Sequence, residues 1–202
     1  MEKLSDNKIV KGPEIKKLDP VQERIGALKG LREGLRVGAQ VEGELALVVL
    51  GLKPGTQINV GDAEKAKDVS KILVKAGLMP ETIERDGQVV VVSTKSKDKL
   101  DELKVLSPSK DHEEFGRMMG YPESAIKAFA NKDLLLPDDQ QKELTKDLPF
   151  FSFKISRDNF QRELKVIEQW NRAILKYSPD LIDRVYDIET AERFKKHLSS
   201  LN

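Results

Sequence analysis

The stretch Thr82–Ser93, with the sequence TIERDGQVVVVS, places a turn between two runs typical of β-strands. Asp86-Gly87 is one of the strongest two-residue signals for a β-hairpin, because both positions tolerate the left-handed backbone that such a turn requires. The run Val89–Val92 is continuous rather than alternating, which predicts a strand buried on both faces. The sequence therefore predicts an antiparallel hairpin whose second strand lies inside the protein.

The residues before this hairpin predict the rest of a small α/β unit. Leu45–Leu52 is mostly apolar and is followed by Pro54-Gly55, a pair typical of a type II turn, so we expect a buried strand there. Thr56–Val60 alternates and predicts a second strand. Asp62 is well placed as the N-cap of a helix over 63–76, which carries one apolar face.

Further toward the N-terminus, Asp19-Pro20 predicts the start of a helix over 20–42. Glycine recurs in it at every fourth position: Gly26, Gly30, Gly34 and Gly38. Each glycine costs a helix roughly 1 kcal/mol relative to alanine, so we expect another backbone to pack along the stripe. Two alternatives remain open: a ligand or nucleic-acid backbone fills the gap, or the segment is not one continuous helix. The basic residues that would bind nucleic acid are Arg24, Lys29, Arg32 and Arg36.

On the other side of the hairpin, Ser96 is expected to cap a short helix to about 106, and Ser107-Pro108 marks a boundary. Beyond it we expect helices over 110–119, 122–131, from 137, 159–177, 179–186 and 187–198, with an extended aromatic segment at 149–153. The 7 Phe, 3 Tyr and 1 Trp all lie at or after Phe115. These patterns predict an α+β protein: a flexible tail over 1–18, an α/β unit with an aliphatic core over 19–106, and a mainly helical, aromatic-rich unit over 107–202.

The overall composition excludes several classes of function. Basic and acidic residues nearly balance, 35 against 34, so charge alone does not predict capture of nucleic acid or anionic lipid. The chain has no cysteine, which excludes disulfides and thiolate chemistry. No apolar run approaches the ~20 residues of a membrane span, and the N-terminus lacks a signal region. We expect a soluble, cytoplasmic protein without a cofactor.

No catalytic or metal motif is complete. His112-Glu113-Glu114 suggests a zinc-protease helix, but that motif needs a second histidine four residues after the first, where Gly116 stands. We therefore expect neither a metal site nor a catalytic residue. Turn 53–56 lacks the glycine-rich run and the Gly-Lys-Ser/Thr ending of a phosphate-binding loop.

The densest polar cluster lies at a predicted corner between two helices. Its members are His112, Arg117, Tyr121 and Glu123. One interpretation is structural, a corner held by Gly120-Tyr121-Pro122. The other is a ligand site, which predicts a concave pocket closed by the aromatic segment near Phe151. Trp170 and Asn171, in the longest predicted helix, are further candidate ligand-binding residues, although core packing also explains Trp170.

Three segments together resemble a largely archaeal protein family of unknown function. They are Gly51-Leu-Lys-Pro-Gly55, the run from His112 through Gly116 and Gly120-Tyr121-Pro122 to Phe129, and Leu148–Ser152 followed by Glu168–Asn171 and Ser178-Pro179. The resemblance implies an archaeal, cytoplasmic setting and a signature corner at Tyr121. A cysteine pair often follows the family's Gly-Tyr-Pro element, and Ser124 and Ala125 take those positions here. Any role of those thiols would be absent from this chain.

The sequence leaves three hypotheses for function. The first is a non-enzymatic binding module that associates with nucleic acid or protein through the glycine-striped basic helix. The second is a small-ligand-binding protein or enzyme that uses the corner from His112 to Glu123. The third is a homo-oligomeric structural protein. None of the three predicts a membrane partner.

Overall fold

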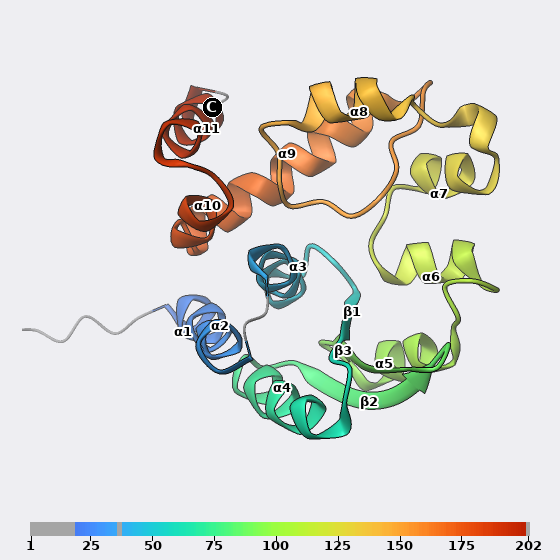
Figure 1. Cartoon of the computed structure of the whole chain (residues 1–202), viewed down its shortest axis with the longest axis vertical. Helices are drawn as coiled ribbons and strands as arrows, with labels where there is room; N and C mark the ends of the chain where they lie inside the picture. Colours follow the sequence, from blue (N-terminus) through green and yellow to red (C-terminus); the bar gives the residue numbers. More distant parts are fainter. Residues whose placement is uncertain (1–18, 36–37, 201–202) are drawn as a thin grey trace, which may run out of the picture.

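The computed structural model describes residues 19–35 and 38–200 of the 202-residue chain. The expected tail over 1–18, and Arg36, lie outside the described residues. Within them the structure has an α+β fold, as the sequence predicts: one small antiparallel sheet lies toward one end of the molecule, and the C-terminal helices lie at the other (Figure 1).

The sheet contains β1 (Gly55–Asn59), β2 (Met79–Arg85) and β3 (Gln88–Thr94) in the order β1-β3-β2. Both pairings are antiparallel, and β3 is the central strand. The predicted hairpin between β2 and β3 is confirmed, with φ of 50° at Asp86 and 74° at Gly87. Both residues of the turn thus have the left-handed backbone that made Asp-Gly the expected pair.

Consecutive valines of β3 pack on opposite faces of the sheet. Val91 faces a core formed with α4 (Ala63–Lys75), while Val90 and Val92 face α5 (Lys97–Val105). All three side chains are fully buried, which confirms the prediction of a strand covered on both sides. The predicted N-caps are also present, because the Asp62 and Ser96 side chains each accept a backbone N–H from the first turn of their helix.

The prediction of a strand over Leu45–Leu52 is wrong. Leu45–Leu50 belong to α3 (Ala39–Leu50), and the helix is followed by Gly51 with a left-handed φ of 76°. The apolar run is continuous because this helix is buried around most of its circumference: Leu45 and Val48 pack toward the sheet, while Leu47 packs into the C-terminal helices. A short apolar run does not distinguish a buried strand from a buried helix.

The prediction of one glycine-striped helix over 20–42 is also wrong. The chain forms α1 (Pro20–Ala27), α2 (Lys29–Leu35) and the start of α3. No backbone packs along the described part of the stripe, since a Cβ at Gly26 or Gly38 would meet nothing within 4 Å and one at Gly30 would touch only the Ile72 side chain. The close approach occurs instead at Gly43 of α3, where a Cβ would overlap the ring of Phe150.

Helices dominate the rest of the chain, close to the ranges that the sequence predicts. They are α6 (His112–Met118), α7 (Glu123–Ala130), η1 (Lys132–Leu134), α8 (Asp138–Thr145), α9 (Phe160–Tyr177), α10 (Asp180–Val185) and α11 (Ile188–Ser200). Asn159 precedes the longest helix, α9, and its side chain makes no capping hydrogen bond. The aromatic segment 149–153 lies outside helices and strands.

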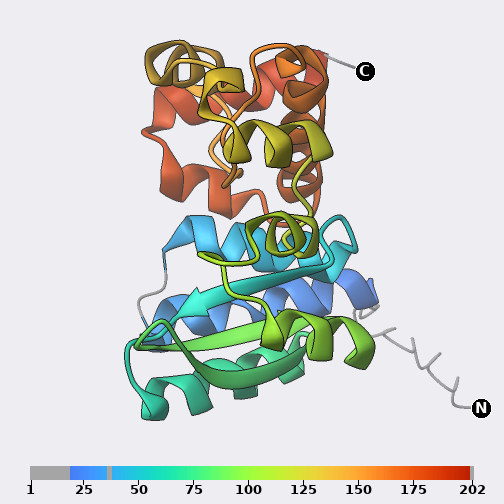
Figure 2. The ribbon, with the colours of Figure 1, turned by 90° about the vertical axis from the view of Figure 1, so that its right-hand side faces the viewer.

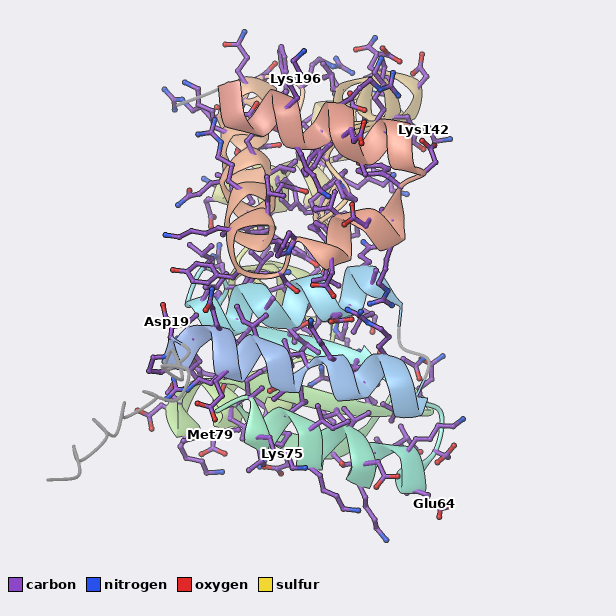
Figure 3. All side chains as sticks on the ribbon, turned by 90° about the vertical axis from the view of Figure 1, so that its left-hand side faces the viewer. Asp19, Glu64, Lys75, Met79, Lys142 and Lys196 are labelled. Atoms are coloured by element: carbon purple, nitrogen blue, oxygen red, sulfur yellow. The ribbon has the colours of Figure 1, made fainter. Side chains whose placement is uncertain are left out.

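Helix α3 lies between the sheet and the C-terminal helices (Figure 2). It contributes to the aliphatic core on one side and, through Leu47, to the aromatic-rich core with Trp170 and Phe194 on the other. Helices α1 and α2 run beside α3 and α4 (Figure 3). In the same view, Lys75 and Lys196 lie toward opposite ends of the molecule. No helix in the described part of the chain is long and apolar enough to cross a bilayer.

Candidate functional site

Three segments that are distant in the sequence meet at Lys53: the turn at 51–55, the corner at Tyr121 and helix α9 at Trp170. A Cβ at Gly120, whose φ is 74°, would lie 2.9 Å from Cδ of Pro54 and 3.3 Å from Cα of Lys53, so the glycine lets the two turns touch. The Lys53 ammonium lies 5.3 Å from the centre of the Tyr121 ring and 5.1 Å from the centre of the Trp170 ring. Both distances fit cation–π contacts.

Lys53 is a completely buried cation with one carboxylate partner. Its side chain is 0% exposed, and its Nζ donates a hydrogen bond of 3.1 Å to Oε2 of Glu44 on α3. The hydroxyl of Thr56 donates to the same oxygen at 3.4 Å. Burial lowers the pKa of the Lys53 ammonium, and the nearby Glu44 carboxylate opposes that shift.

Tyr121 connects this buried pair to the aromatic segment. Its hydroxyl lies 3.1 Å from the Ser152 hydroxyl, and its ring centre lies 5.6 Å from that of Phe153, which in turn contacts Trp170 edge-on. Burial raises the pKa of Tyr121 to about 12. The hydroxyl therefore remains protonated at neutral pH and can donate one hydrogen bond.

A cavity of about 510 Å³ lies beside Tyr121, between α6, α7 and the aromatic segment. Its wall is mainly apolar and aromatic, with contributions from Phe115, Ala125, Ile126, Phe129, Phe151 and Phe153. Polar groups are few: the Tyr121–Ser152 pair, His112, Gln141 and Lys154. This combination of size, apolar lining and few polar groups is typical of a site for a small organic ligand.

His112 lines this cavity from the start of α6. Its ring lies 6.2 Å from that of Phe129, centre to centre. Its Nε2 is buried and has no hydrogen-bond partner among the described residues. A ligand or a water molecule reaching that nitrogen would supply the partner that a buried polar atom normally has.

Arg117 and Glu123, the other members of the predicted polar cluster, do not line the cavity. Arg117 is 44% exposed and pairs with Glu123 at 2.9 Å and with Glu113 and Glu114 at 3.2 Å each. These contacts tie the end of α6 to the start of α7 on the outer surface. The structure thus brings His112 and Tyr121 together at the cavity and leaves the ion pairs outside it.

Trp170 and Asn171 lie behind the aromatic segment rather than in the cavity wall. Asn171 is fully buried; its Oδ1 accepts the backbone N–H of Phe150 at 3.3 Å, and its Nδ2 donates to the carbonyl of Ile167 at 2.8 Å. Trp170 packs between Lys53 and Phe153. Both residues therefore position the segment that forms the wall.

The described cations of α1 and α2 take part in intramolecular contacts. Arg32 pairs with Glu42 at 2.9 Å and with Asp180 at 3.0 Å, and Lys29 lies 3.6 Å from Asp180. The guanidinium of Arg24 lies over Gly77, where a Cβ would approach its Nε at 3.1 Å. These cations fasten α1 and α2 to α3, α10 and the end of α4.

Sequence reasoning missed Glu44, Lys53 and Phe129. Lysine beside Pro-Gly is typical of an exposed turn, and nothing local to it indicates burial. One usable signal was present: Glu44 precedes a continuous apolar run, and a buried carboxylate needs a partner.

The described residues contain no group of three His, Cys, Asp or Glu side chains arranged to hold a metal ion. Comparisons with protein families, curated proteins and solved structures gave no match for the chain. The function of this chain must therefore be inferred from the geometry of the site.

Proposed function

We propose that this chain is a small-molecule-binding protein and that the apolar part of its ligand occupies the cavity beside Tyr121. The observation that carries the proposal is the cavity itself, about 510 Å³ with an aromatic and aliphatic wall. Pockets of this volume with a few polar groups are the usual sites of small organic ligands. His112 belongs to this wall, and its buried Nε2 has no hydrogen-bond partner among the described residues.

Contacts on both sides of the cavity hold the elements that form its wall in place. Gly116 allows α6 and α7 to approach, because a Cβ there would lie 2.9 Å from Cγ1 of Ile126. On the opposite side, Asn171 holds the backbone at Phe150. Binding residues that are fixed by neighbouring contacts lose little conformational entropy when a ligand enters.

The test uses an uncharged fluorescent dye that brightens in apolar surroundings. Ala125 is 2% exposed and lines the cavity, so Ala125→Leu should fill the space and weaken dye binding by about tenfold or more. Ala130 lies on the exposed side of the same helix, and Ala130→Leu is the matched control. Undiminished binding by Ala125→Leu would remove the proposal.

A second variant covers the case in which Ala125→Leu does not fold. Phe129 is 56% exposed and lines the cavity, so Phe129→Ser should weaken dye binding with little loss of stability. Val105 is 79% exposed and lies outside the cavity, and Val105→Ser should bind the dye as the unmodified protein does. Equal binding by both variants would contradict the proposal.

A further inference from the structure

A second, more polar cavity of about 320 Å³ adjoins the first. The two share four lining residues: Pro108, Phe115, Tyr121 and Ser152. The hydrogen-bonded hydroxyls of Tyr121 and Ser152 therefore lie at the boundary between an apolar compartment and a polar one. A molecule that extends past this pair would contact both.

The second cavity is lined by Glu44, whose carboxylate accepts hydrogen bonds from the described residues through only one of its two oxygens. Glu44 lines it with a side chain that is 11% exposed. Its Oε2 accepts from Lys53 and Thr56, whereas Oε1 accepts no hydrogen bond from any described residue. Lys53 itself is 0% exposed and does not line this cavity, whereas Glu44 does.

Two glutamines complete the polar lining. Gln40 donates its Nε2 to the carbonyl of Phe151 at 3.1 Å, which leaves its Oε1 as an acceptor. Gln57 accepts a hydrogen bond from Arg85 through its Oε1, which leaves its Nε2 as a donor. Within the described part of the chain, Glu44 and the two glutamines together provide two free acceptor oxygens, one of them charged, and one free donor.

We propose that the two cavities form a single site for an amphipathic amine, with its apolar part beside Phe129 and its ammonium group beside Glu44. This inference rests on the proposed function. An ammonium group has three donors and no acceptor, which suits two acceptor oxygens, one of them charged. A carboxylate in the same place would face Glu44, and like charges in a partly buried cavity repel strongly.

The first cavity is lined by a cation, but that cation should attract an acidic ligand less than Glu44 attracts an amine. Lys154 lines that cavity, but its Nζ is paired with Asp138 at 2.8 Å. An acidic head group would have to compete with that carboxylate for it. Glu44 is also paired, with Lys53 through Oε2, but its Oε1 accepts no hydrogen bond from the described residues.

The test compares three ligands with one apolar part: naphthylethylamine, naphthylethanol and naphthylacetate. Displacement of the dye should show the amine binding about tenfold or more tightly than the acid, with the alcohol between them. If none of the three displaces the dye and the dye itself does not bind, the proposed function fails. If the dye binds and the acid displaces it as well as the amine does, the proposed function stands and this inference is overturned.

A paired substitution connects the preference to Glu44. Glu44→Gln together with Lys53→Met removes both charges and leaves no buried ion alone, so the preference for the amine over the alcohol should disappear. Glu42→Gln is the matched control on the same helix, because Glu42 lines neither cavity. A double variant that still prefers the amine would overturn the inference.

Discussion

Glu42 and Glu44 are two residues apart on α3, yet their surroundings differ. Side chains at this spacing point about 200° apart around a helix. Both residues are buried, Glu42 at 2% and Glu44 at 9% exposure. Glu42 pairs with Arg32 through Oε1 and with Arg184 through Oε2, and so joins α2 and α10. Glu44 pairs with Lys53 through one oxygen only.

This difference distinguishes a structural ion-pair cluster at Glu42 from a candidate ligand-binding site at Glu44. Around Glu42 both carboxylate oxygens are engaged and the cations are about a quarter exposed, 26% for Arg32 and 27% for Arg184. Around Glu44 the cation is completely buried, and the carboxylate reaches a cavity with an oxygen to spare. A buried carboxylate with an oxygen that accepts no hydrogen bond is the better candidate for ligand binding.

The largest effect should follow from removing the Glu44 carboxylate. Glu44→Ala leaves the Lys53 ammonium buried without a partner, which typically costs about 3–5 kcal/mol of the free energy of unfolding. Lys53→Met should cost much less, because the remaining carboxylate can be hydrated from the second cavity. Chemical denaturation measures both. Equal losses would mean that the carboxylate is as poorly hydrated as the ammonium.

Gly43 lies between the two glutamates and tests how α3 is fixed against the aromatic segment. Gly43→Ala would push a Cβ into the Phe150 ring and should cost about 1–3 kcal/mol of stability, as overpacking does. Gly26→Ala in α1 meets nothing and should instead stabilise the helix by up to about 1 kcal/mol. Thermal unfolding compares the two variants. A neutral Gly43→Ala would show that Phe150 can move away from α3.

Glu42→Gln should give a smaller loss, about 1 kcal/mol, because its arginine partners remain partly hydrated. Since these cations reach solvent, the loss should shrink as salt is raised, whereas the loss in Glu44→Ala should change little. Denaturation at low and high salt distinguishes the two. The comparison between the two glutamates breaks down if both losses respond to salt alike.

Much of the fold could be predicted because its signals are local. Asp86-Gly87 specified the hairpin, Asp62 and Ser96 specified helix starts, and four consecutive valines specified a strand buried on both faces. The run at 45–52 failed because a helix between two cores is apolar on nearly every side, as a buried strand is. The apolar pattern of a segment reports how many of its faces are buried. Here a buried helix and a buried strand would give the same pattern.

The site was less predictable, because it is made of contacts between distant segments. His112, Tyr121 and Phe151 were singled out from one corner and one aromatic run, and all three line the first cavity. Their role in binding stays a prediction. Glu44 and Lys53 were not singled out, since the burial of Lys53 depends on Tyr121 and Trp170, which lie far along the chain.

The smallest effect expected is a pH dependence from Lys53. Burial lowers the pKa of its ammonium below the ordinary 10.5, so between that lowered value and 10.5 the folded protein holds fewer protons than the unfolded chain. Stability from this residue therefore rises with pH through that window, and at lower pH the cost of burying the charge is present in full. Lys53→Met should lack this rise.

The titration of Tyr121 opposes this rise of stability with pH, so its contribution has to be separated from that of Lys53. Its pKa is raised from 10.0 to about 12, so above pH 10 the unfolded chain loses this proton first and stability falls. Because Tyr121 is present in both proteins, subtracting the stability of Lys53→Met from that of the unmodified protein removes most of its contribution. Denaturation midpoints followed from about pH 7 to pH 10 should then show a difference that grows with pH. A constant difference would mean that Lys53 keeps its ordinary pKa in the folded protein, and that the Glu44 carboxylate and the two aromatic rings together compensate for its burial.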